Sequence, residues 1–403
     1  MSKKAVIYGA GNIGRGFIGQ LFYESGYEIV FIDVDKALIE QLNSAGEYPI
    51  KFTDGGGITV KNVSGIDGDN GNSGEIAENI ALADIMAVSV GANVLKHIMQ
   101  PIASGINKRL TVDYRPLQII LCENLIGAGQ IMRDGVREYI SEELQTMYDE
   151  KIGFAEASVG RTVPNQTDEM KAGNPLRIVA ESYSHLPVDK DGFRGEIPEI
   201  KDMISYSPFE YFIRRKLYLH NMGHALCAYL GDIAGYEYIW QAVRDRYIEL
   251  IVRKTMQCSA LALSVIYAAD MRELSEYIEN LVHRFGDEAL GDTVKRVGND
   301  LKRKLAPSDR IMGTRMICTE TGISTRYICL AVAAAVNFKG DKLSGGALED
   351  ILREAGSLDL LENHENLGHL GDSEDFALVK RYDGLIKSGA SMRELYEAVG
   401  CKD

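Results

Sequence analysis

A glycine pattern near the start of the chain restricts its fold more than any other feature. Residues 9–14 read Gly-Ala-Gly-Asn-Ile-Gly. They follow a short apolar run, Ala5 to Tyr8, that suits a buried parallel strand, and they precede a stretch that favours a helix up to about Tyr23. G-x-G-x-x-G between a strand and a helix is the fingerprint of a dinucleotide-binding βαβ unit. The chain is therefore predicted to begin with such a unit.

The three glycines of this loop have distinct expected roles. Gly9 permits a tight turn, Gly11 lets the backbone approach a pyrophosphate, and Gly14 allows the helix to pack closely on the strand. The helix N-terminus then presents free N–H groups to the phosphates. The alternative is a glycine-rich turn that binds nothing, and a strand, a helix and a downstream acid in register argue against it. The residues expected to contact the cofactor here are Gly9, Ala10, Gly11, Asn12, Ile13 and Gly14.

An acidic residue indicates which dinucleotide the unit binds. Asp33 follows a second apolar run, Glu28 to Ile32, at the position where an acid hydrogen-bonds the ribose 2′-hydroxyl. A carboxylate there repels a 2′-phosphate, so the sequence favours NAD over NADP, although Lys36 lies close enough to weaken that preference. Val90 and Gly91 end a later apolar run and are expected to pass near the cofactor, but a plain βα turn explains them equally well.

The first half of the chain alternates strand and helix patterns, which predicts an α/β fold with a doubly wound, mostly parallel sheet of the Rossmann type. Two apolar runs around the turn at residues 54–57 indicate a hairpin, and residues 67–74 have the composition of a mobile loop. The expected strands are Ala5 to Tyr8, Glu28 to Ile32, Tyr48 to Phe52, Ile58 to Val63, Ile85 to Val90 and Gln118 to Cys122, with Phe154 to Val163 and Arg177 to Ala180 as extensions of the sheet.

The pattern changes near residue 185. Residues 187–198 form a charged stretch with Pro and Gly and no periodicity, which we interpret as a loop. From Pro208 onward helical patterns dominate, for example at residues 244–268. We therefore expect two domains: a NAD-binding Rossmann-type domain of residues 1–195 and an all-helical substrate and catalytic domain of residues 196–403.

Composition excludes several classes of function. The 403 residues carry a formal net charge of −14, which argues against nucleic acid or an anionic membrane as a partner. The six cysteines form no C-x-x-C pair, so neither a zinc ribbon nor a redox dithiol is indicated. His364 and His369 lie five residues apart, which is not metal-ligand spacing on one helix face, so no metal is expected.

The same features predict a cytoplasmic protein, and they leave open whether it is a monomer or a small homo-oligomer. The scattered cysteines fit a reducing compartment. The first strand starts at about Ala5, which leaves no room for a signal peptide. No apolar run approaches the roughly 18 residues that a membrane span requires.

One helical stretch carries side chains suited to hydride-transfer chemistry. Residues 214–224 read Arg-Arg-Lys-Leu-Tyr-Leu-His-Asn-Met-Gly-His. In an α-helix, which turns about 100° per residue, Lys216, His220 and His224 fall within about 80° of one another. Asn221 falls within about 140° of Lys216. Without a metal, removal of a hydroxyl proton needs a side-chain base and donors that steady the oxyanion. A polar surface helix with satisfied histidines is the alternative.

Several motifs recur in a fixed order along the chain. They are G-A-G-N-I-G-R-G-F-I-G at residues 9–19, C-E-N at 122–124, R-K-L with N-x-G-H at 215–224, A-Y-L-G at 228–231, and R-V-G followed by R-K-L at 296–305. This ordered set covers most of the chain and resembles the polyol-specific long-chain dehydrogenase/reductase family. The resemblance implies hydride transfer between NAD(H) and a polyol/ketose pair, foremost mannitol 1-phosphate and fructose 6-phosphate.

The resemblance also implies roles for individual residues. Lys216 would be the general acid/base, and Asn124 and Asn221 would donate to the substrate oxygen that becomes the carbonyl. His224 would position the substrate and the lysine. The residues implied to contact the far end of the sugar chain are Arg296 and Lys304, joined by Asn299 and Arg303.

One motif departs from the family. Residues 160–164 read Gly-Arg-Thr-Val-Pro where the family usually has D-R-I-x-P, so the acid that lines the substrate pocket in relatives is missing at Gly160. The substrate alternatives are therefore a hexuronate and free mannitol, oxidised at its second carbon. The basic residues at 302–304, with Arg310, could hold a phosphate or form a solvated helix face.

Two further hypotheses differ in class or in fold family. A catalytically inactive protein that senses NAD is one, and the presence of Lys216, Asn221 and His224 argues against it. The β-hydroxyacid dehydrogenases are the other, since they also join a Rossmann domain to a helical domain with a catalytic lysine. They lack the N-x-G-H continuation.

Overall fold

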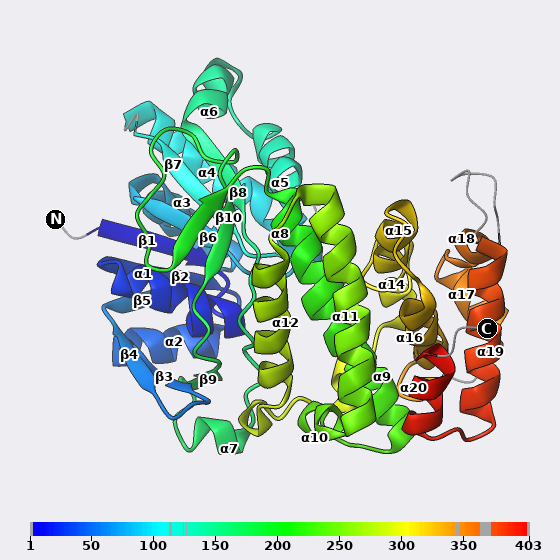
Figure 1. Ribbon diagram of the computed structural model, residues 1–403. Helices are drawn as coiled ribbons and strands as arrows, with labels where there is room; N and C mark the ends of the chain where they lie inside the picture. The colour runs from blue at the N-terminus through cyan, green and yellow to red at the C-terminus, as the bar shows by residue number, and fades with distance from the viewer. Residues whose placement is uncertain are drawn as a thin grey trace. The chain divides into compact units, whose positions relative to one another are not determined.

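The computed structural model describes residues 3–112, 115–123, 125, 127–343, 346–362 and 372–400. Contacts within the chain divide it into two compact units, Met1–Phe212 and Ile213–Asp403 (Figure 1). The named strands of the described residues all lie in the first unit. The domain boundary expected after residue 195 stays a prediction.

The first unit is built on a six-stranded parallel sheet in the order β5-β2-β1-β6-β7-β8. The chain moves outward through β2 and β5 on one side of β1, and through β6, β7 and β8 on the other. This reversal confirms the doubly wound α/β fold, and such sheets bind ligands at the carboxyl ends of the strands where the order reverses, here β1 and β6. The strands are β1 (Lys3–Tyr8), β2 (Tyr27–Asp33), β5 (Val63–Asp67), β6 (Ile85–Val88), β7 (Leu117–Leu121) and β8 (Ile152–Glu156).

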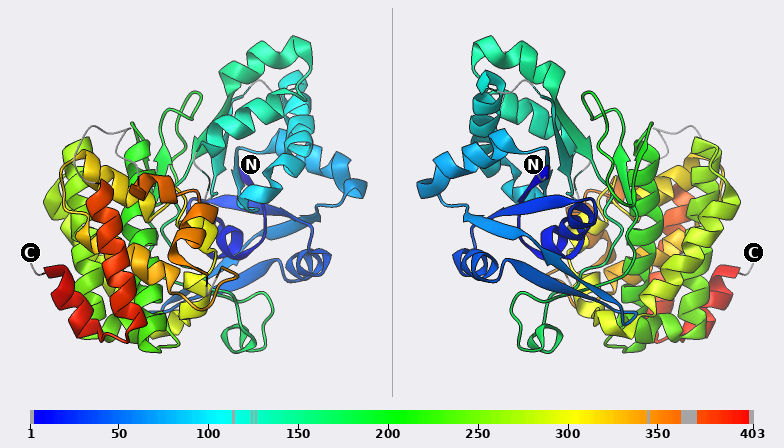
Figure 2. Two further views of the ribbon diagram at one scale, coloured as in Figure 1. Left: turned by 90° about the vertical axis from the view of Figure 1, so that its right-hand side faces the viewer. Right: turned by 90° about the vertical axis from the view of Figure 1, so that its left-hand side faces the viewer.

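Helices cover both faces of this sheet (Figure 2). On β1, Ala5 and Ile7 pack into the core under one layer of helices. Val6 and Tyr8 point the other way, into the core under the opposite layer. A strand buried on both sides reads as one continuous apolar run, which is why the sequence revealed it. The first layer holds η1 (Gly14–Ile18), α1 (Gly19–Glu24) and α2 (Lys36–Ala45), and the second holds α3 (Ser73–Leu82), α4 (Leu95–Val112), α5 (Ala128–Arg137) and α6 (Gln145–Lys151).

Several expected strand boundaries are corrected by the structure. The hairpin of β3 (Glu47–Phe52) and β4 (Gly57–Lys61) is confirmed. The chain turns at Asn62, whose φ of 56° is tolerated by asparagine, so a separate strand, β5, begins at Val63. The run expected to continue to Val163 leaves the sheet after Glu156. The expected loop at residues 67–74 is only partly a loop, because β5 ends at its first residue and α3 begins at Ser73.

Short strands outside the main sheet were misassigned. β9 (Ile178–Ala180) pairs with β3 in a three-stranded sheet, so it does not extend the main sheet as expected. The stretch interpreted as a loop contains β10 (Leu186–Asp189) and β11 (Met203–Tyr206), which pair in parallel. Leu186 and Val188 are fully buried, but Pro187 and the shortness of these strands hide the pattern in the sequence.

The second unit is helical in its described residues, apart from one isolated bridge between Tyr238 and Thr293, which confirms the predicted helical region. No described helix is long and apolar enough to cross a membrane. Its helices after α8 (Glu210–Arg215) are η5 (Lys216–Asn221), α9 (Met222–Ala234), α10 (Ile239–Arg244), α11 (Arg246–Tyr267), α12 (Met271–Phe285), α13 (Val294–Gly298), α14 (Leu301–Lys304), α15 (Met312–Glu320), α16 (Arg326–Val336), α17 (Leu348–Glu354), α18 (Leu358–Glu362), α19 (Asp372–Lys387) and α20 (Met392–Gly400).

A buried ion pair joins helices that are distant in sequence. The Arg315 Nε atom lies 2.7 Å from Asp375 Oδ2, and the two side chains are only 2% and 7% exposed. The other Asp375 oxygen accepts a hydrogen bond from the Thr325 hydroxyl, and Arg315 also donates to the Leu360 carbonyl. One carboxylate thus links α19 to α15 and to the start of α16.

Removing this carboxylate should destabilise the helical unit. In Asp375→Ala the Arg315 guanidinium stays buried without its counter-charge, so we expect the free energy of unfolding to fall by about 3–5 kcal/mol. The control is Glu397→Ala, which removes an exposed helical pair with Arg393 and should leave the free energy of unfolding close to that of the wild type. Urea unfolding followed by circular dichroism measures both, and equal effects would contradict the assignment.

Candidate active site

The glycine loop turns tightly at the carboxyl end of β1, against the residue that follows β6. Gly9 has a φ of 102°, and a Cβ on it would lie 2.5 Å from the Ser89 carbonyl oxygen at the end of β6. A Cβ on Gly14 would lie 2.0 Å from the Gly9 carbonyl oxygen. In contrast, a Cβ on Gly11 would meet no atom within 4 Å, so space is open in front of this residue. The loop therefore has the shape that a bound pyrophosphate requires.

The Asp33 carboxylate lies beside this loop at the end of β2. Its Oδ2 atom accepts a hydrogen bond from the Ala10 N–H at 2.7 Å, and its Oδ1 atom accepts one from the Asp35 N–H at 2.9 Å. A carboxylate has about four acceptor positions, so two are left for ribose hydroxyls. This arrangement fits the expected role of Asp33 and adds a second one, because the same side chain also holds the loop.

The turn after β6 is held by a residue that the sequence analysis missed. The N–H groups of Val90 and Gly91 both donate to Glu123 Oε1, at 2.8 and 3.0 Å. Burial raises the pKa of the Glu123 carboxyl, while these two hydrogen bonds oppose the rise. Glu123 is the middle residue of the C-E-N motif, which was the available signal. Asn124, the expected substrate contact in that motif, lies outside the described residues.

The residue that departs from the family motif, Gly160, lies beside the ring of Tyr183. A Cβ on Gly160 would approach the ring of Tyr183 to 3.0 Å, so a larger side chain requires that ring to move. The next residue, Arg161, is buried and donates to the Gly16 carbonyl at 2.9 Å and to Gln20 Oε1 at 2.7 Å. Arg161 thus fastens this segment to the helix that follows the glycine loop.

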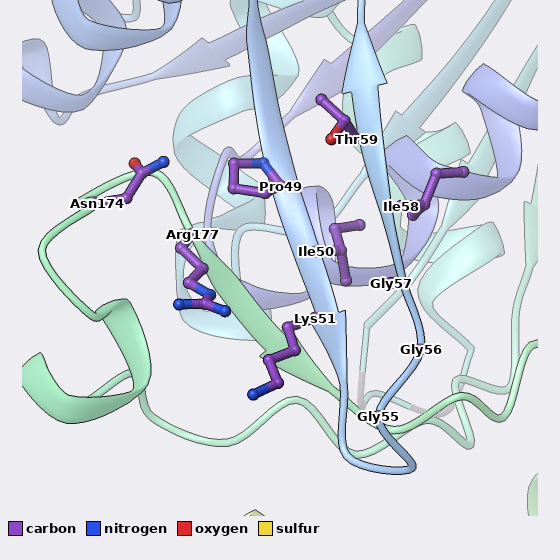
Figure 3. A pocket seen from close by; sticks show the side chains of 10 residues that line it. All are labelled: Pro49, Ile50, Lys51, Gly55, Gly56, Gly57, Ile58, Thr59, Asn174 and Arg177. Carbon is purple, nitrogen blue, oxygen red and sulfur yellow. The ribbon is translucent and has the colours of Figure 1, made fainter.

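A groove of about 560 Å³ lies on the small sheet of β4, β3 and β9 (Figure 3). Lys51 and Arg177 are its charged lining residues, and residues 55–57 of the hairpin turn border it. None of the residues expected to bind cofactor or substrate lines it, so it is not part of the expected site.

In the second unit, the expected catalytic stretch is not an α-helix. Lys216–Asn221 form a π-helix, η5, between α8 and α9, and the Met222 N–H donates to the Leu217 carbonyl five residues earlier. In a π-helix the hydrogen bonds join residues five apart, so Asn221 is brought round toward Lys216. The α-helical estimate of about 140° between them is therefore wrong. Such π segments are frequent at functional sites. No residue pattern in the sequence predicts this π-helix.

His224 belongs to a charge cluster that the sequence analysis only partly identified. Its Nε2 atom lies 3.4 Å from Asp292 Oδ2, and its ring stacks on Phe285 with centroids 4.9 Å apart. The other Asp292 oxygen accepts a hydrogen bond from Arg296. Burial alone would raise the pKa of Asp292, but the bonds from His224 and Arg296 outweigh it and lower the pKa below its usual range. Asp292 therefore stays ionised at neutral pH.

His220 faces the interior of the unit. Burial lowers the pKa of its imidazole well below the usual value, and the charges of Arg284, Lys216 and Arg310 add to this. Its Nδ1 atom has no hydrogen-bond partner among the described residues. His220 is thus a neutral buried ring, which fits the alternative of a core histidine.

The basic residues expected to bind the far end of a substrate are engaged within the chain. The Lys304 ammonium donates to the carbonyls of Val297 and Asn299 at the end of α13. Burial, together with the charges of Arg310 and Arg303, lowers the pKa of Lys304 to about 7. The ion pairs of the other cations are Arg303 with Asp300 and Asp309, Arg310 with Asp309, and Lys302 with Glu354.

The roles of Arg296, Asn299, Arg303 and Lys304 in substrate binding stay predictions. Within the described ranges, no cluster of three or more His, Cys, Asp or Glu side chains could hold a metal ion. His364 and His369 lie outside the described residues.

Comparison with known families agrees with both units. The model of the mannitol dehydrogenase Rossmann domain matches residues 3–202, and that of the mannitol dehydrogenase C-terminal domain matches residues 209–387. The chain belongs to the mannitol dehydrogenase family. The family resemblance inferred from the ordered motifs is confirmed.

Individual relatives of this mannitol dehydrogenase family member cover most of its length. It is 38% identical to a mannitol-1-phosphate 5-dehydrogenase of Brevibacillus brevis over 364 residues, 89% of this chain and 92% of the relative. It is 37% identical to the enzyme of the same name from Anoxybacillus flavithermus over 90% of this chain and 95% of the relative.

Solved structures share the fold of this family member. A substrate-free D-sorbitol dehydrogenase superposes with a TM-score of 0.76 at 16% identity, over 99% of this chain and 95% of that chain. A Pseudomonas fluorescens mannitol 2-dehydrogenase in ternary complex with NAD and D-mannitol gives 0.73 at 15% identity, over 99% and 94%.

Two alanine substitutions in the loop should separate binding from folding. In Gly11→Ala the methyl group enters open space, so we expect a normal melting temperature but NADH binding weakened at least about tenfold, or about 1.4 kcal/mol. In Gly14→Ala the methyl group meets a backbone carbonyl, so we expect a lower melting temperature. Fluorescence titration with NADH and thermal unfolding measure the two effects, and wild-type affinity in Gly11→Ala would refute the pyrophosphate position.

Proposed function

We propose that the protein is a cytoplasmic enzyme that interconverts mannitol 1-phosphate and fructose 6-phosphate with NAD(H). The observation that carries this is the 36–38% identity to proteins named mannitol-1-phosphate 5-dehydrogenase, over 83–90% of this chain. Both units take part in the similarity, so the cofactor loop and the charged helical stretch belong to the matched region.

The first unit suits NAD in two respects. The open space at Gly11 leaves room for the pyrophosphate, and the free acceptor positions of Asp33 can take the ribose hydroxyls. A 2′-phosphate would meet the Asp33 charge, so NADP is disfavoured. When bound, the nicotinamide supplies or accepts the hydride.

Side chains of the second unit would transfer the proton to and from the substrate oxygen. In the reductive direction the carbonyl carbon of the ketose takes the hydride, and its oxygen takes a proton from the Lys216 ammonium. Asn221, and Asn124 by the family resemblance, would donate hydrogen bonds to that oxygen while negative charge develops on it. In the oxidative direction neutral Lys216 takes the proton back from the hydroxyl. His224 would hold the substrate beside these groups.

A second candidate function is the oxidation of a polyol that carries no phosphate. It is favoured by one observation: the four cations at residues 302–304 and 310 all have partners within the chain. A free hexitol or a hexuronate would not need to displace those partners.

A panel of substrates tests the proposal. We expect kcat/KM with NADH to be at least about a hundredfold higher for fructose 6-phosphate than for fructose, fructuronate or tagaturonate, and lower with NADPH than with NADH. An unphosphorylated substrate that performs best would establish the second candidate. NADH binding without turnover of any of them would point to a non-catalytic sensor.

Replacing the proposed base should stop the chemical step and spare the cofactor site. General acid–base catalysis contributes about 10²–10⁴-fold, so we expect kcat of Lys216→Ala to fall by at least that order. NADH affinity should stay near wild type, because the glycine loop belongs to the other unit. Lys254→Ala, which removes an exposed lysine of α11, is the control and should turn over normally. Near-normal kcat in Lys216→Ala would exclude this lysine as the base.

A further inference from the structure

We propose that Asp292 is a positioning residue that fixes the tautomer of His224, so that Nε2–H donates to the carboxylate and Nδ1 is left as the acceptor for a substrate hydroxyl. The part that concerns the substrate rests on the proposed function, in which His224 contacts it. The same carboxylate also accepts a hydrogen bond from Arg296, so one side chain would position both His224 and Arg296.

The geometry leaves the His224 ring little freedom. Nε2 lies 3.4 Å from Asp292 Oδ2, and the ring plane is within 11° of that of Phe285. Turning the ring over would break the contact with the carboxylate, because the carbon Cε1 would then take the place of Nε2. The stack and the carboxylate therefore select a single ring orientation.

Backbone hydrogen bonds fix the segment that carries Asp292. Its carbonyl accepts a hydrogen bond from the Ile239 N–H at 2.9 Å, and the Val294 N–H donates to the Glu237 carbonyl at 2.9 Å. Thr293 forms a bridge with Tyr238 between these two bonds. The carboxylate, only 6% exposed, thus projects from a segment tied on both sides.

The chemistry follows from the donors and acceptors present. A neutral imidazole has one N–H donor and one acceptor nitrogen, and the hydrogen bond made by one nitrogen decides the state of the other. Asp292 is ionised and can only accept, so the proton of neutral His224 must sit on Nε2. The neighbouring ring of His220, with its centroid 6.2 Å away, is neutral.

An isosteric change should reverse this tautomer. Arg296 has donors only, so in Asp292→Asn the amide oxygen goes to Arg296 and the amide N–H₂ faces His224. Nε2 must then accept, and the proton moves to Nδ1. We expect kcat to fall at least about tenfold while NADH affinity stays unchanged.

The measurement is ¹⁵N NMR of the full-length protein labelled at its seven histidines, with His224 assigned by comparison with His224→Gln. In the wild type, in the pH range where His224 is neutral, we expect Nε2 protonated and Nδ1 unprotonated. In Asp292→Asn we expect the reverse. Asp383→Asn is the matched control, since it changes another buried carboxylate that pairs with a lysine, and it should alter neither the His224 signals nor kcat.

The wild-type spectrum decides the proposal even if Asp292→Asn fails to fold. A wild-type His224 protonated on Nδ1 would overturn it, and so would unchanged signals and kcat in a folded Asp292→Asn protein. The spectrum is recorded without substrate, so failure of the proposed sugar-phosphate activity would leave this result standing. Conversely, turnover of fructose 6-phosphate with the wrong tautomer would refute the inference alone.

Discussion

The first unit depends on one close contact, that between Gly14 and the carbonyl of Gly9. No side chain fits between them, so the helix must begin directly against the turn that leaves β1. Side chains around the turn then fix its shape. Asp33 holds the Ala10 N–H, and Arg15 donates to the Ala10 carbonyl at 2.6 Å and to the Leu176 carbonyl at 3.0 Å. A loop held from these sides presents its open space at Gly11 before any ligand arrives, which lowers the entropy cost of binding.

The second unit repeats the same principle with different groups. A buried carboxylate at Asp292 holds one imidazole and one guanidinium, as Asp33 holds the backbone of the loop. Both sites also contain a π-helical segment, η1 after the glycine loop and η5 at Lys216. A π segment widens the helix locally and changes which residues share a face. In η5 this change brings an amide toward the amine, an arrangement that an α-helix would not give.

The features predictable from sequence are those whose cause is local. The glycine loop, Asp33 and the buried strands carry their own signatures in residue type and spacing. β9 does not, because the sheet that three residues join depends on which neighbour they meet, here β3, with Ile178 packed against Gly16. Asp292 is likewise an ordinary acid in the sequence, and its contact appears only when the fold brings a distant imidazole to it. Glu123 lies in the C-E-N motif, but the motif does not say which distant backbone turn its carboxylate holds.

Lys304 places a basic group in a buried position of the helical unit. Its ammonium donates a hydrogen bond to the Val297 carbonyl in the last turn of α13, yet burial and two nearby arginines lower its pKa to about 7. In the unfolded chain a lysine titrates near 10.4, so between the two values the unfolded state binds more protons, and stability rises with pH across that window. The fold therefore bears a cost for this charge at neutral pH. An anion placed beside Lys304 would favour the charged form and offset that cost. Two carbonyls and the charges of Asp300 and Asp309 already offset part of the cost within the chain, and a bound phosphate would offset more of it.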